Sequence, residues 1–329
     1  MTEWRTDDFD YTLPEELIAS RPLEQRDASR MMVVHRKTGD IEHQQFTDFP
    51  QYLQPNDLVV LNDTRVVRAR FFSTDGKVEV VRLESPEPTL WRCLVRPGKR
   101  MRVGKQVSIG NATGTVESVF ENGDRLVRFD QPVDEEKWGQ LALPHYMNRD
   151  SDSTDFDRYQ TVFAADSKPG AIAAPTAGLH FTKELIASLP HAFVTLHVGV
   201  GTFQPVRADR ITDHNMHSER FELSEATANA VKQAERVIAV GTTVTRVLEH
   251  CALQNPPLSP GTGATSIFIY PGFQFKCIGA LLTNFHLPKS TLFMLVSALA
   301  NPDLIKKAYA EAVAQRYRFY SYGDCMLIL

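Results

Sequence analysis

The chain has 329 residues, a formal net charge of −4, 43% hydrophobic residues and 23% charged residues. This composition excludes a disordered chain, and the length favours two domains or one large one. The slight negative charge excludes nucleic-acid binding through overall charge, although a local basic face stays possible. The four cysteines are far apart and form no CxxC pair, which argues against a cysteine-based zinc site and fits a reduced, cytoplasmic setting.

The first 65 residues combine short helical and strand patterns. Residues 1–11 are acidic and lack an apolar stretch, so no secretion signal is expected. Residues 13–19 predict a short helix, because a proline stands near its first turn. Residues 58–61, which follow Asp57, form an apolar run that predicts a buried strand.

A polar turn, Asn62-Asp63-Thr64-Arg65, follows that strand. Open α/β sheets place ligand-binding groups at strand ends. Asn62 and Asp63 are therefore candidates to hold ribose hydroxyls, and Arg65 is a candidate to pair with a carboxylate or phosphate. A purely structural turn bridged by Asp63 and Arg65 is the alternative.

From residue 66 to residue 130 the pattern changes to short alternating strands. Six runs at hairpin spacing predict six strands, with an Asn-Gly turn between the last two: 66–72, 77–85, 89–96, 105–110, 113–120 and 125–130. Six short strands with few helical signals predict a small all-β barrel that closes its own edges.

The stretch 92–105 within the predicted barrel carries six basic residues and no acidic one. A basic barrel face suits a nucleic-acid backbone, so four side chains are candidate RNA contacts: Arg96, Lys99, Arg100 and Arg102. A solvated basic strand pair without a partner is the alternative.

After an acidic linker at 150–157 the α/β pattern returns. Apolar runs predict strands at 194–200, 237–240, 266–270 and 280–283, and helical spacing predicts helices at 182–189, 224–236 and 292–300. The last helix is shorter than the roughly 20 residues of a membrane span. We expect an α/β fold in which a large mixed α/β domain, residues 1–65 and 150–329, is interrupted by an inserted small all-β barrel domain, residues 66–149.

Four histidines fall within 38 residues of the second part: His180, His197, His214 and His217. Histidine exchanges a proton near neutral pH. Glycines beside it let the backbone approach a ligand closely, as at Gly199 and Gly201 in the turn that ends at Thr202. Gly241-Thr242 opens a further predicted helix, whose free N–H groups favour an anion.

Two chemistries fit this stretch. Glu219 could fix the tautomer of a neighbouring imidazole in a proton-transfer site. Alternatively, His197, His214, His217 and Glu219 could bind a transition metal, although no HExxH motif supports it. Some of the histidines could also be ordinary core or surface residues.

Long blocks of the chain resemble the S-adenosylmethionine:tRNA ribosyltransferase-isomerase (QueA) family, in family order from near residue 11 to residue 326. They include LPEELIASRPLEQRDASR, LVVLNDTRVVRAR, LPHYMNR, DRYQTVFA, GAIAAPTAGLHFT, FVTLHVGVGTFQPVRADRITDHNMHSE, RVIAVGTT, FIYPGFQFKCIGALLTNFHLPKSTLFMLVSALA and YRFYSYGD. The sequence departs from the family pattern after Arg70, where the turn 71–76 is short and lacks the family's first glycine.

The resemblance implies a tRNA-modifying transferase of queuosine biosynthesis. It would transfer and isomerise the ribosyl part of S-adenosylmethionine onto a 7-aminomethyl-7-deazaguanine base in tRNA, giving epoxyqueuosine-tRNA, adenine and methionine. The implied fold is a large α/β domain with an inserted β-barrel. S-adenosylmethionine is then a co-substrate, and no metal or prosthetic group is implied. We expect tRNA to dock by its anticodon loop, since the base must be accessible, and we expect a cytoplasmic monomer without a membrane segment or an obligate protein partner.

Site roles follow for that reaction. Proton transfer is expected from His197 and His217, with His180 and His214 next and Glu219 orienting one ring. The candidate substrate contacts are Asn62, Asp63, Arg65 (for the methionine carboxylate), Tyr159, Gly199, Gly201, Thr202, Thr242 and His286. The rival functions are a metal-dependent hydrolase built on the histidines and a non-catalytic tRNA-binding protein in which they are structural.

Overall fold

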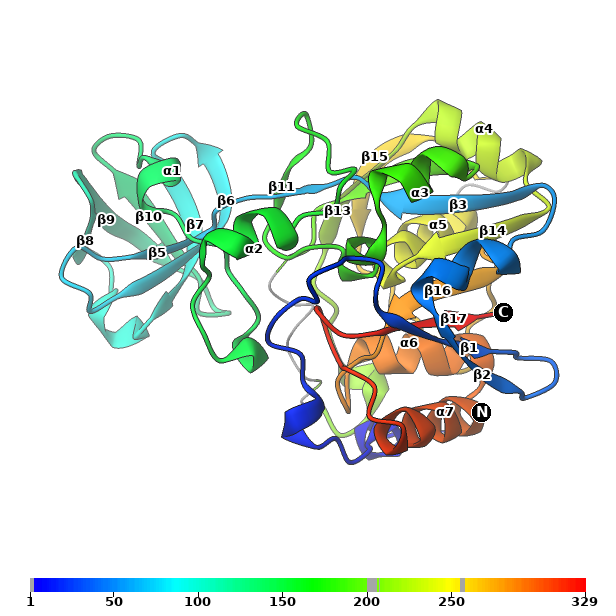
Figure 1. Cartoon of the computed structure of the whole chain (residues 1–329). Coiled ribbons are helices and arrows are strands. Elements are labelled where there is room, and N and C mark those ends of the chain that lie inside the picture. Colours follow the sequence, from blue (N-terminus) through cyan, green and yellow to red (C-terminus); the bar gives the residue numbers. More distant parts are fainter. Residues whose placement is uncertain (1–2, 200–205, 207, 255–257) are drawn as a thin grey trace. The chain divides into compact units, whose positions relative to one another are not determined.

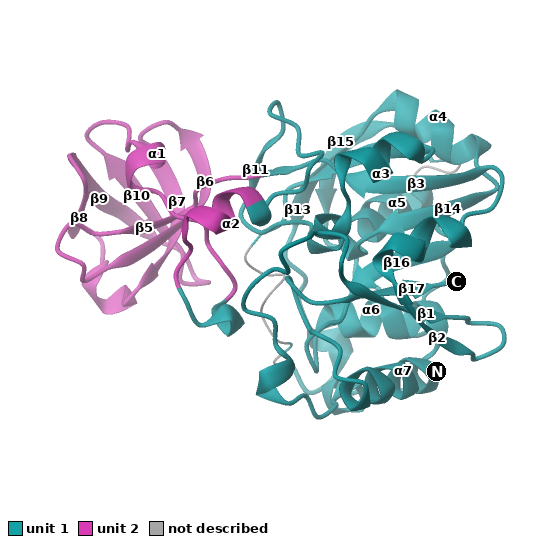
Figure 2. Cartoon of the chain, in the orientation of Figure 1, with its two compact units in different colours: residues 1–65, 145–149, 158–329 teal, residues 66–144, 150–157 magenta. Residues whose placement is uncertain are grey.

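The computed structural model describes residues 3–199, 206, 208–254 and 258–329. It divides into two units, coloured separately in Figure 2: unit 1 comprises Met1–Arg65, His145–Arg149 and Arg158–Leu329, and unit 2 comprises Val66–Pro144 and Asp150–Asp157. Unit 1 is mixed α/β and unit 2 is a barrel-like β-sheet, which confirms the expected fold class. The expected domain boundaries, at residues 65/66 and 149/150, stay a prediction.

Unit 1 is built on a sheet that has nine strands within the described residues, in the order β15-β13-β12-β3-β14-β16-β17-β1-β2 (Figure 1). In that order the strands are Gly261–Thr265, Glu219–Leu223, His191–Leu196, Asp57–Asn62, Arg236–Val240, Ala280–Asn284, Cys325–Ile328, Arg30–Val34 and Ile41–Gln45. β12, β3, β14 and β16 run parallel to one another, so their carboxyl ends meet at one edge. Two further short strands are β4 (Arg65–Val66) and β11 (Pro169–Ala171).

Both faces of the central strands of this sheet are buried, as apolar strands without polar alternation predict, whereas the edge strands β15 and β2 are more exposed. In β3, Leu58 and Val60 belong to one apolar core, and Val59 and Leu61 belong to the other. The first core includes residues of α4 (Glu225–Gln233), α5 (Thr242–Gln254), α6 (Thr291–Ala300) and α7 (Pro302–Ala314). The second includes residues of α3 (Lys183–Ser188) and of the 3-10 turn Phe46–Tyr52. The sheet therefore lies between two layers of helices (Figure 1).

The predicted helices at 182–189, 224–236 and 292–300 are confirmed as α3, α4 and α6. Each begins after a side-chain cap, since the hydroxyls of Thr182, Ser224 and Ser290 accept the N–H of the residue three positions on. The remaining helices are α1 (Glu135–Trp138) and α2 (Ser153–Arg158), and further 3-10 turns are Thr6–Phe9, Glu15–Leu17, Gly98–Arg100, His145–Met147, Thr176–His180 and Ile211–Asp213.

Unit 2 is an antiparallel sheet in the order β5-β6-β7-β10-β9-β8. In that order its strands are Arg70–Phe72, Glu79–Glu87, Leu90–Arg96, Arg125–Phe129, Ala112–Val119 and Gln106–Ile109. The two outer strands approach each other, because the N–H and hydroxyl of Thr74, just after β5, donate to the Ser108 carbonyl in β8 at 2.7 and 3.1 Å. The sheet thus curls around its own core, in which Phe71, Trp91 and Phe129 are buried.

The strand expected at 66–72 is divided in the structure between β4 and β5, with residues 67–69 in neither. Three further predicted elements differ from the structure. Residues 13–19 contain only the 3-10 turn Glu15–Leu17, because Ile18 leaves the turn and pairs with Phe319. The strand expected at 266–270 lies at Gly261–Thr265, where all five residues pair with β13.

The third difference concerns the strand expected at 194–200, which is β12 and ends at Leu196. The Asn62 side chain binds the backbone there, donating to the Leu196 carbonyl at 2.9 Å and accepting the Leu196 N–H at 3.0 Å. This side chain takes the place of a further ladder pair, so the strand stops.

Among the helices that the structure describes, none has the length and apolar character needed to cross a bilayer.

Candidate active site

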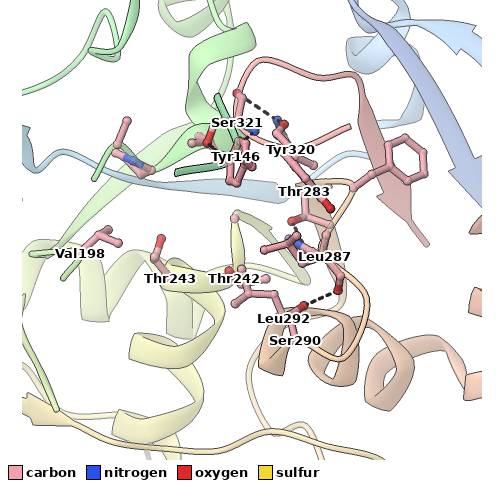
Figure 3. Close-up of a pocket in the computed structure, with 18 residues that line it drawn as sticks. Tyr146, Val198, Thr242, Thr243, Thr283, Leu287, Ser290, Leu292, Tyr320 and Ser321 are labelled. Atoms are coloured by element: carbon pink, nitrogen blue, oxygen red, sulfur yellow. Dashed lines mark hydrogen bonds between the residues drawn. The ribbon is translucent and has the colours of Figure 1, made fainter. Parts of the chain in front are cut away.

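A pocket lies at the carboxyl edge of the parallel strands of unit 1 (Figure 3). Thr283 and Asn284 line it from the end of β16, and Gly241 and Thr242 line it from the turn between β14 and α5. Thr242 and His286 are the sequence-predicted site residues that line it. Its other described lining residues are Tyr146, Ala174, Pro175, Thr176, Ala177, Val198, Thr243, Phe285, Leu287, Ser290, Leu292, Tyr320 and Ser321. This edge is where open α/β sheets bind ligands.

His286 forms part of the pocket wall as a neutral ring. Its Nε2 lies 3.0 Å from Thr283 Oγ1, and its backbone N–H donates to the Tyr309 hydroxyl at 2.9 Å. Burial lowers the pKa of His286 to about 3. A ring that stays neutral and is bonded to the wall is suited to shaping the pocket more than to exchanging protons.

Two tyrosines form an aromatic side of the pocket. The rings of Tyr146 and Tyr320 lie 4.5 Å apart between centroids and are tilted by 54°. The Tyr146 hydroxyl hydrogen-bonds with Ser321 Oγ at 2.5 Å, and burial raises the pKa of both phenols. This side therefore offers neutral aromatic surface next to hydroxyl groups, which suits a flat heterocycle.

His180 lies in a buried hydrogen-bond chain that reaches the pocket through Asn284. Its Nδ1 is 2.8 Å from Ser29 Oγ, and its Nε2 is 3.1 Å from Asn284 Oδ1. Because Asn284 Nδ2 donates to the Tyr320 carbonyl at 2.8 Å, its Oδ1 must accept, so the proton of His180 is assigned to Nε2. Burial lowers the pKa of His180 to about 4. Both ring nitrogens are occupied, and the ring holds Asn284 in position.

His197 lies just beyond β12, near the end of β3. Its Nδ1 is 2.8 Å from the Thr64 hydroxyl, and its ring packs on the bare backbone of Gly170, where a Cβ would lie 2.9 Å from Nδ1. Burial lowers its pKa, and the positive charges of Arg220 and Lys168 lower it further. His197 is therefore neutral at pH 7 and able to accept a proton.

Asn62 and Asp63 accompany His197 at this edge. Asn62 is buried and bonded to Leu196, so its side chain is used within the fold. The Asp63 carboxylate accepts the Thr195 hydroxyl at 2.6 Å, and burial raises the pKa of Asp63. Asp63, being only half-buried, keeps access to solvent.

Glu219 is buried in an ion pair with Arg246, and each side chain is 6% exposed. Its other carboxylate oxygen accepts the Gly199 N–H at 3.0 Å. Glu219 thus anchors the backbone that follows Val198 in the pocket wall. Arg246 comes from α5, so this pair joins the helix to the glycine-containing segment.

The other predicted residues are dispersed. His214 is half-buried and packs edge-on against Phe268 at 5.7 Å, while His217 is exposed. Tyr159 is buried against Tyr322. The Arg65 guanidinium pairs with the exposed Asp166. The remaining two predicted contacts, Gly201 and Thr202, lie outside the described residues.

Within the described part of the chain, no three His, Cys, Asp or Glu side chains gather as a metal site would need. The group proposed for a metal, made of His197, His214, His217 and Glu219, is therefore not assembled. In unit 2, the four predicted RNA contacts are exposed, and no ion pair with a described residue involves them: Arg96, Lys99, Arg100 and Arg102.

Sequence reasoning missed Asn284, Thr243 and Arg246. Asn284 ends a buried strand, as Asn62 does, so the strand-end rule could have found it. Thr243 belongs to the recognised Gly-Thr-Thr turn, but only the burial of its hydroxyl distinguishes it from Thr242. Arg246 is a buried charged residue of α5, and no local signal in the sequence distinguishes it from an exposed one.

Comparison with known proteins agrees with this architecture. A family model described as "Queuosine biosynthesis protein" matches residues 6–328. Among similar proteins, the S-adenosylmethionine:tRNA ribosyltransferase-isomerase of Halothermothrix orenii is 48% identical, and that of Symbiobacterium thermophilum is 51% identical; each comparison covers 99% of this chain and 100% of the relative. The crystal structure of S-adenosylmethionine tRNA ribosyltransferase from Thermotoga maritima is 37% identical, with a TM-score of 0.56, and covers 98% of this chain and 100% of that one. The resemblance seen in the sequence is confirmed, and the chain belongs to the family of queuosine biosynthesis proteins that includes the S-adenosylmethionine:tRNA ribosyltransferase-isomerases.

Proposed function

We propose that this chain is an S-adenosylmethionine:tRNA ribosyltransferase-isomerase. It transfers and isomerises the ribosyl moiety of S-adenosylmethionine onto the 7-aminomethyl-7-deazaguanine base of tRNA, and it releases adenine and methionine. Full-length similarity to proteins of that name supports the reaction class.

The uncharged pocket at the carboxyl edge of β14 and β16 is the observation that carries the proposal. Adenosine is neutral, and the methionine part of the co-substrate is a zwitterion beside a sulfonium. A lining of hydroxyls, an amide and two tyrosines offers hydrogen bonds and aromatic surface to the neutral adenosine part of such a molecule.

The chemistry calls for proton transfer. The positive sulfonium acidifies the C–H bonds of the adjacent ribose carbon, so a base can remove a proton there. The electron pair left on that carbon and the lone pair of the tRNA amine form the new bonds of the transferred, rearranged unit, and the amine gives up a proton. Two bonds break: the C–S bond, whose pair stays on sulfur and gives methionine, and the bond to adenine, whose pair stays on a ring nitrogen that takes up a proton from an acid.

His197 is our candidate for the base. Its lowered pKa keeps it neutral, and it lies next to Val198, which lines the pocket. Asp63, half-buried beside it, is our candidate to hold ribose hydroxyls. His217 stays the second candidate for proton transfer from the sequence alone, since its ring is exposed and is not among the described residues that line the pocket.

tRNA is the proposed partner, docked by its anticodon loop, and the proposed location is the cytoplasm. The exposed basic stretch of unit 2 supports an RNA backbone contact, because cations that form no ion pair with a described residue are available to neutralise phosphates. The stretch comprises Arg96, Lys99, Arg100, Arg102 and Lys105.

Adenine release from S-adenosylmethionine tests the proposal directly. With tRNA that carries the aminomethyl-deazaguanine base, we expect one adenine per modified tRNA. With tRNA that has guanine at that position, we expect none. Binding of tRNA without adenine release would instead favour an RNA-binding protein. Hydrolysis that stops in a chelator would favour the metal-dependent alternative.

A further inference from the structure

The amino end of α5 is the one part of the pocket built to accept an anion. The N–H groups of its first three residues, Thr242, Thr243 and Val244, find no acceptor among the described residues, while the N–H of Thr245 bonds to the Gly241 carbonyl. Gly241 precedes the helix and has no side chain with which to cap it. α3, α4, α6 and α7, in contrast, carry side-chain caps. Free N–H groups and the helix dipole together favour negative charge at this point.

The hydroxyl of Thr243 is a second, independent sign of a ligand. The residue is 8% exposed, and its Oγ1 has no hydrogen-bond partner among the described residues. Gly241 has no Cβ, and one built there would lie 3.6 Å from this Oγ1. The open space beside the hydroxyl belongs to the pocket, in whose wall Figure 3 shows Thr242 and Thr243 together. A buried hydroxyl without a partner costs stability unless something binds it.

The charge of the surroundings decides which anion fits. The described lining residues include no Asp, Glu, Lys or Arg, so the positive end of α5 is the main fixed electrostatic feature of the pocket. S-adenosylmethionine has one anionic group, the carboxylate of its methionine part. Arg65, expected to take that carboxylate, pairs with Asp166 and is not among the lining residues.

We infer that the first turn of α5, with the Thr243 hydroxyl, binds the methionine carboxylate of S-adenosylmethionine. This inference rests on the proposed function. A carboxylate has two oxygens that can accept the free N–H groups and the hydroxyl together. Adenine and the ribose hydroxyls are neutral and gain little from the helix dipole, so they bind elsewhere in the pocket, with the tyrosines as the aromatic side.

The test compares two ligands on two kinds of variant. S-adenosylmethionine and its decarboxylated form, which lacks only the carboxylate, are titrated calorimetrically against the wild type, Thr243→Val, Thr243→Ala and the control Thr243→Ser. Loss of a charge-assisted hydrogen bond should weaken S-adenosylmethionine binding roughly 10- to 100-fold in Thr243→Val and Thr243→Ala. Thr243→Ser keeps the hydroxyl and should stay within about threefold of the wild type.

The decarboxylated ligand separates the outcomes. Its affinity should change less than about threefold in Thr243→Val, because the hydroxyl has no carboxylate to bind. If Thr243→Val weakens the binding of both ligands equally, Thr243 contacts a part of S-adenosylmethionine other than the carboxylate, and the inference is wrong. The inference is also wrong if Thr243→Val weakens the binding of neither ligand. A wild type that binds the decarboxylated form and S-adenosylmethionine equally well would also overturn it. A wild type that binds neither ligand would refute the proposed function itself.

Discussion

Replacing Glu219 by Gln should destabilise unit 1 strongly, because it leaves the Arg246 guanidinium buried without its counter-charge. Each partner is 6% exposed, so water can do little to solvate the remaining charge. Glutamine keeps the shape of the side chain and an oxygen that can still accept the Gly199 N–H. The effect of this substitution therefore reports on the ion pair.

Breaking a buried pair by removing one charge typically costs about 3–5 kcal/mol. For a unit of this size, each kcal/mol lowers the midpoint of thermal unfolding by roughly 2–4 °C, so the midpoint should fall by roughly 10 °C. Calorimetry or circular dichroism measures this shift. Glu222→Gln is the matched control: it lies on the same strand and pairs with Lys168, but at 41% exposure its loss should cost less than about 1 kcal/mol.

A double-mutant cycle completes the test. In an Arg246→Met background the charge is already gone, so Glu219→Gln should cost much less than it does in the wild type. If Glu219→Gln lowers the midpoint no more than Glu222→Gln does, or if its cost is the same with and without Arg246, the buried pair does not stabilise unit 1 and the reasoning is wrong.

Three further predictions concern the histidines and the basic face. The pKa of His180 is about 4 in the fold and about 6.5 in the unfolded chain. The free energy of unfolding should therefore decrease by up to about 3 kcal/mol as the pH falls from 6.5 toward 4. The thermal unfolding midpoint of His180→Gln should depend less steeply on pH over that range. His197→Gln should lower turnover roughly 10²- to 10⁴-fold and leave the affinity for S-adenosylmethionine nearly unchanged. In the wild type, kcat/KM should decline only at a pH below the usual pKa of histidine, since the pKa of His197 is lowered. A variant that keeps full turnover would exclude the base role. The double substitution Arg100→Gln, Arg102→Gln should reduce the slope of log affinity for tRNA against log salt concentration by about 0.7 for each phosphate that the variant no longer neutralises. The control Arg128→Gln should leave the slope unchanged, because the Arg128 side chain already pairs with two carboxylates. Equal slopes for the wild type and both variants would show that this stretch does not bind the RNA backbone.

Local sequence signals were sufficient for much of the fold. Thr182, Ser224 and Ser290 are good N-caps in any context, and helices begin after each of them. The hairpin spacing of residues 66–130 likewise predicts the six strands of unit 2, because each strand pairs mainly with its neighbours in sequence.

Elements that depend on distant partners were not predictable in the same way. Ile18 ends its turn early because Phe319, 301 residues away in sequence, offers a strand-like partner. The strand Gly261–Thr265 contains two glycines, which lower its local strand propensity, and its five residues are extended where they pair with β13. In both cases tertiary pairing outweighs local propensity.

The same distinction explains the candidate site. The strand-end rule points to Asp63 at the right edge of the sheet, because it depends on topology that apolar runs reveal. Thr242, predicted from the start of a helix, and His286, predicted from the resemblance, also lie beyond the ends of parallel strands. The rule does not reveal whether a polar side chain at that edge is free for a ligand. Asn62 is used to end β12, and only its two hydrogen bonds to Leu196 show this.

The four histidines show why closeness in sequence does not imply a shared site. His180 is separated from its two partners, Ser29 and Asn284, by 151 and 104 residues, and they occupy both of its ring nitrogens. His214 packs against an aromatic ring, and His217 is exposed. His197 alone combines a lowered pKa, partial burial and a single hydrogen bond, at Nδ1, with a described residue.

The Thr64 hydroxyl can donate to Nδ1, placing the proton on Nε2, or accept from it, leaving Nε2 as the basic nitrogen. A base role requires the second arrangement, so Thr64→Val should slow turnover without changing S-adenosylmethionine affinity, and Thr64→Ser should restore it.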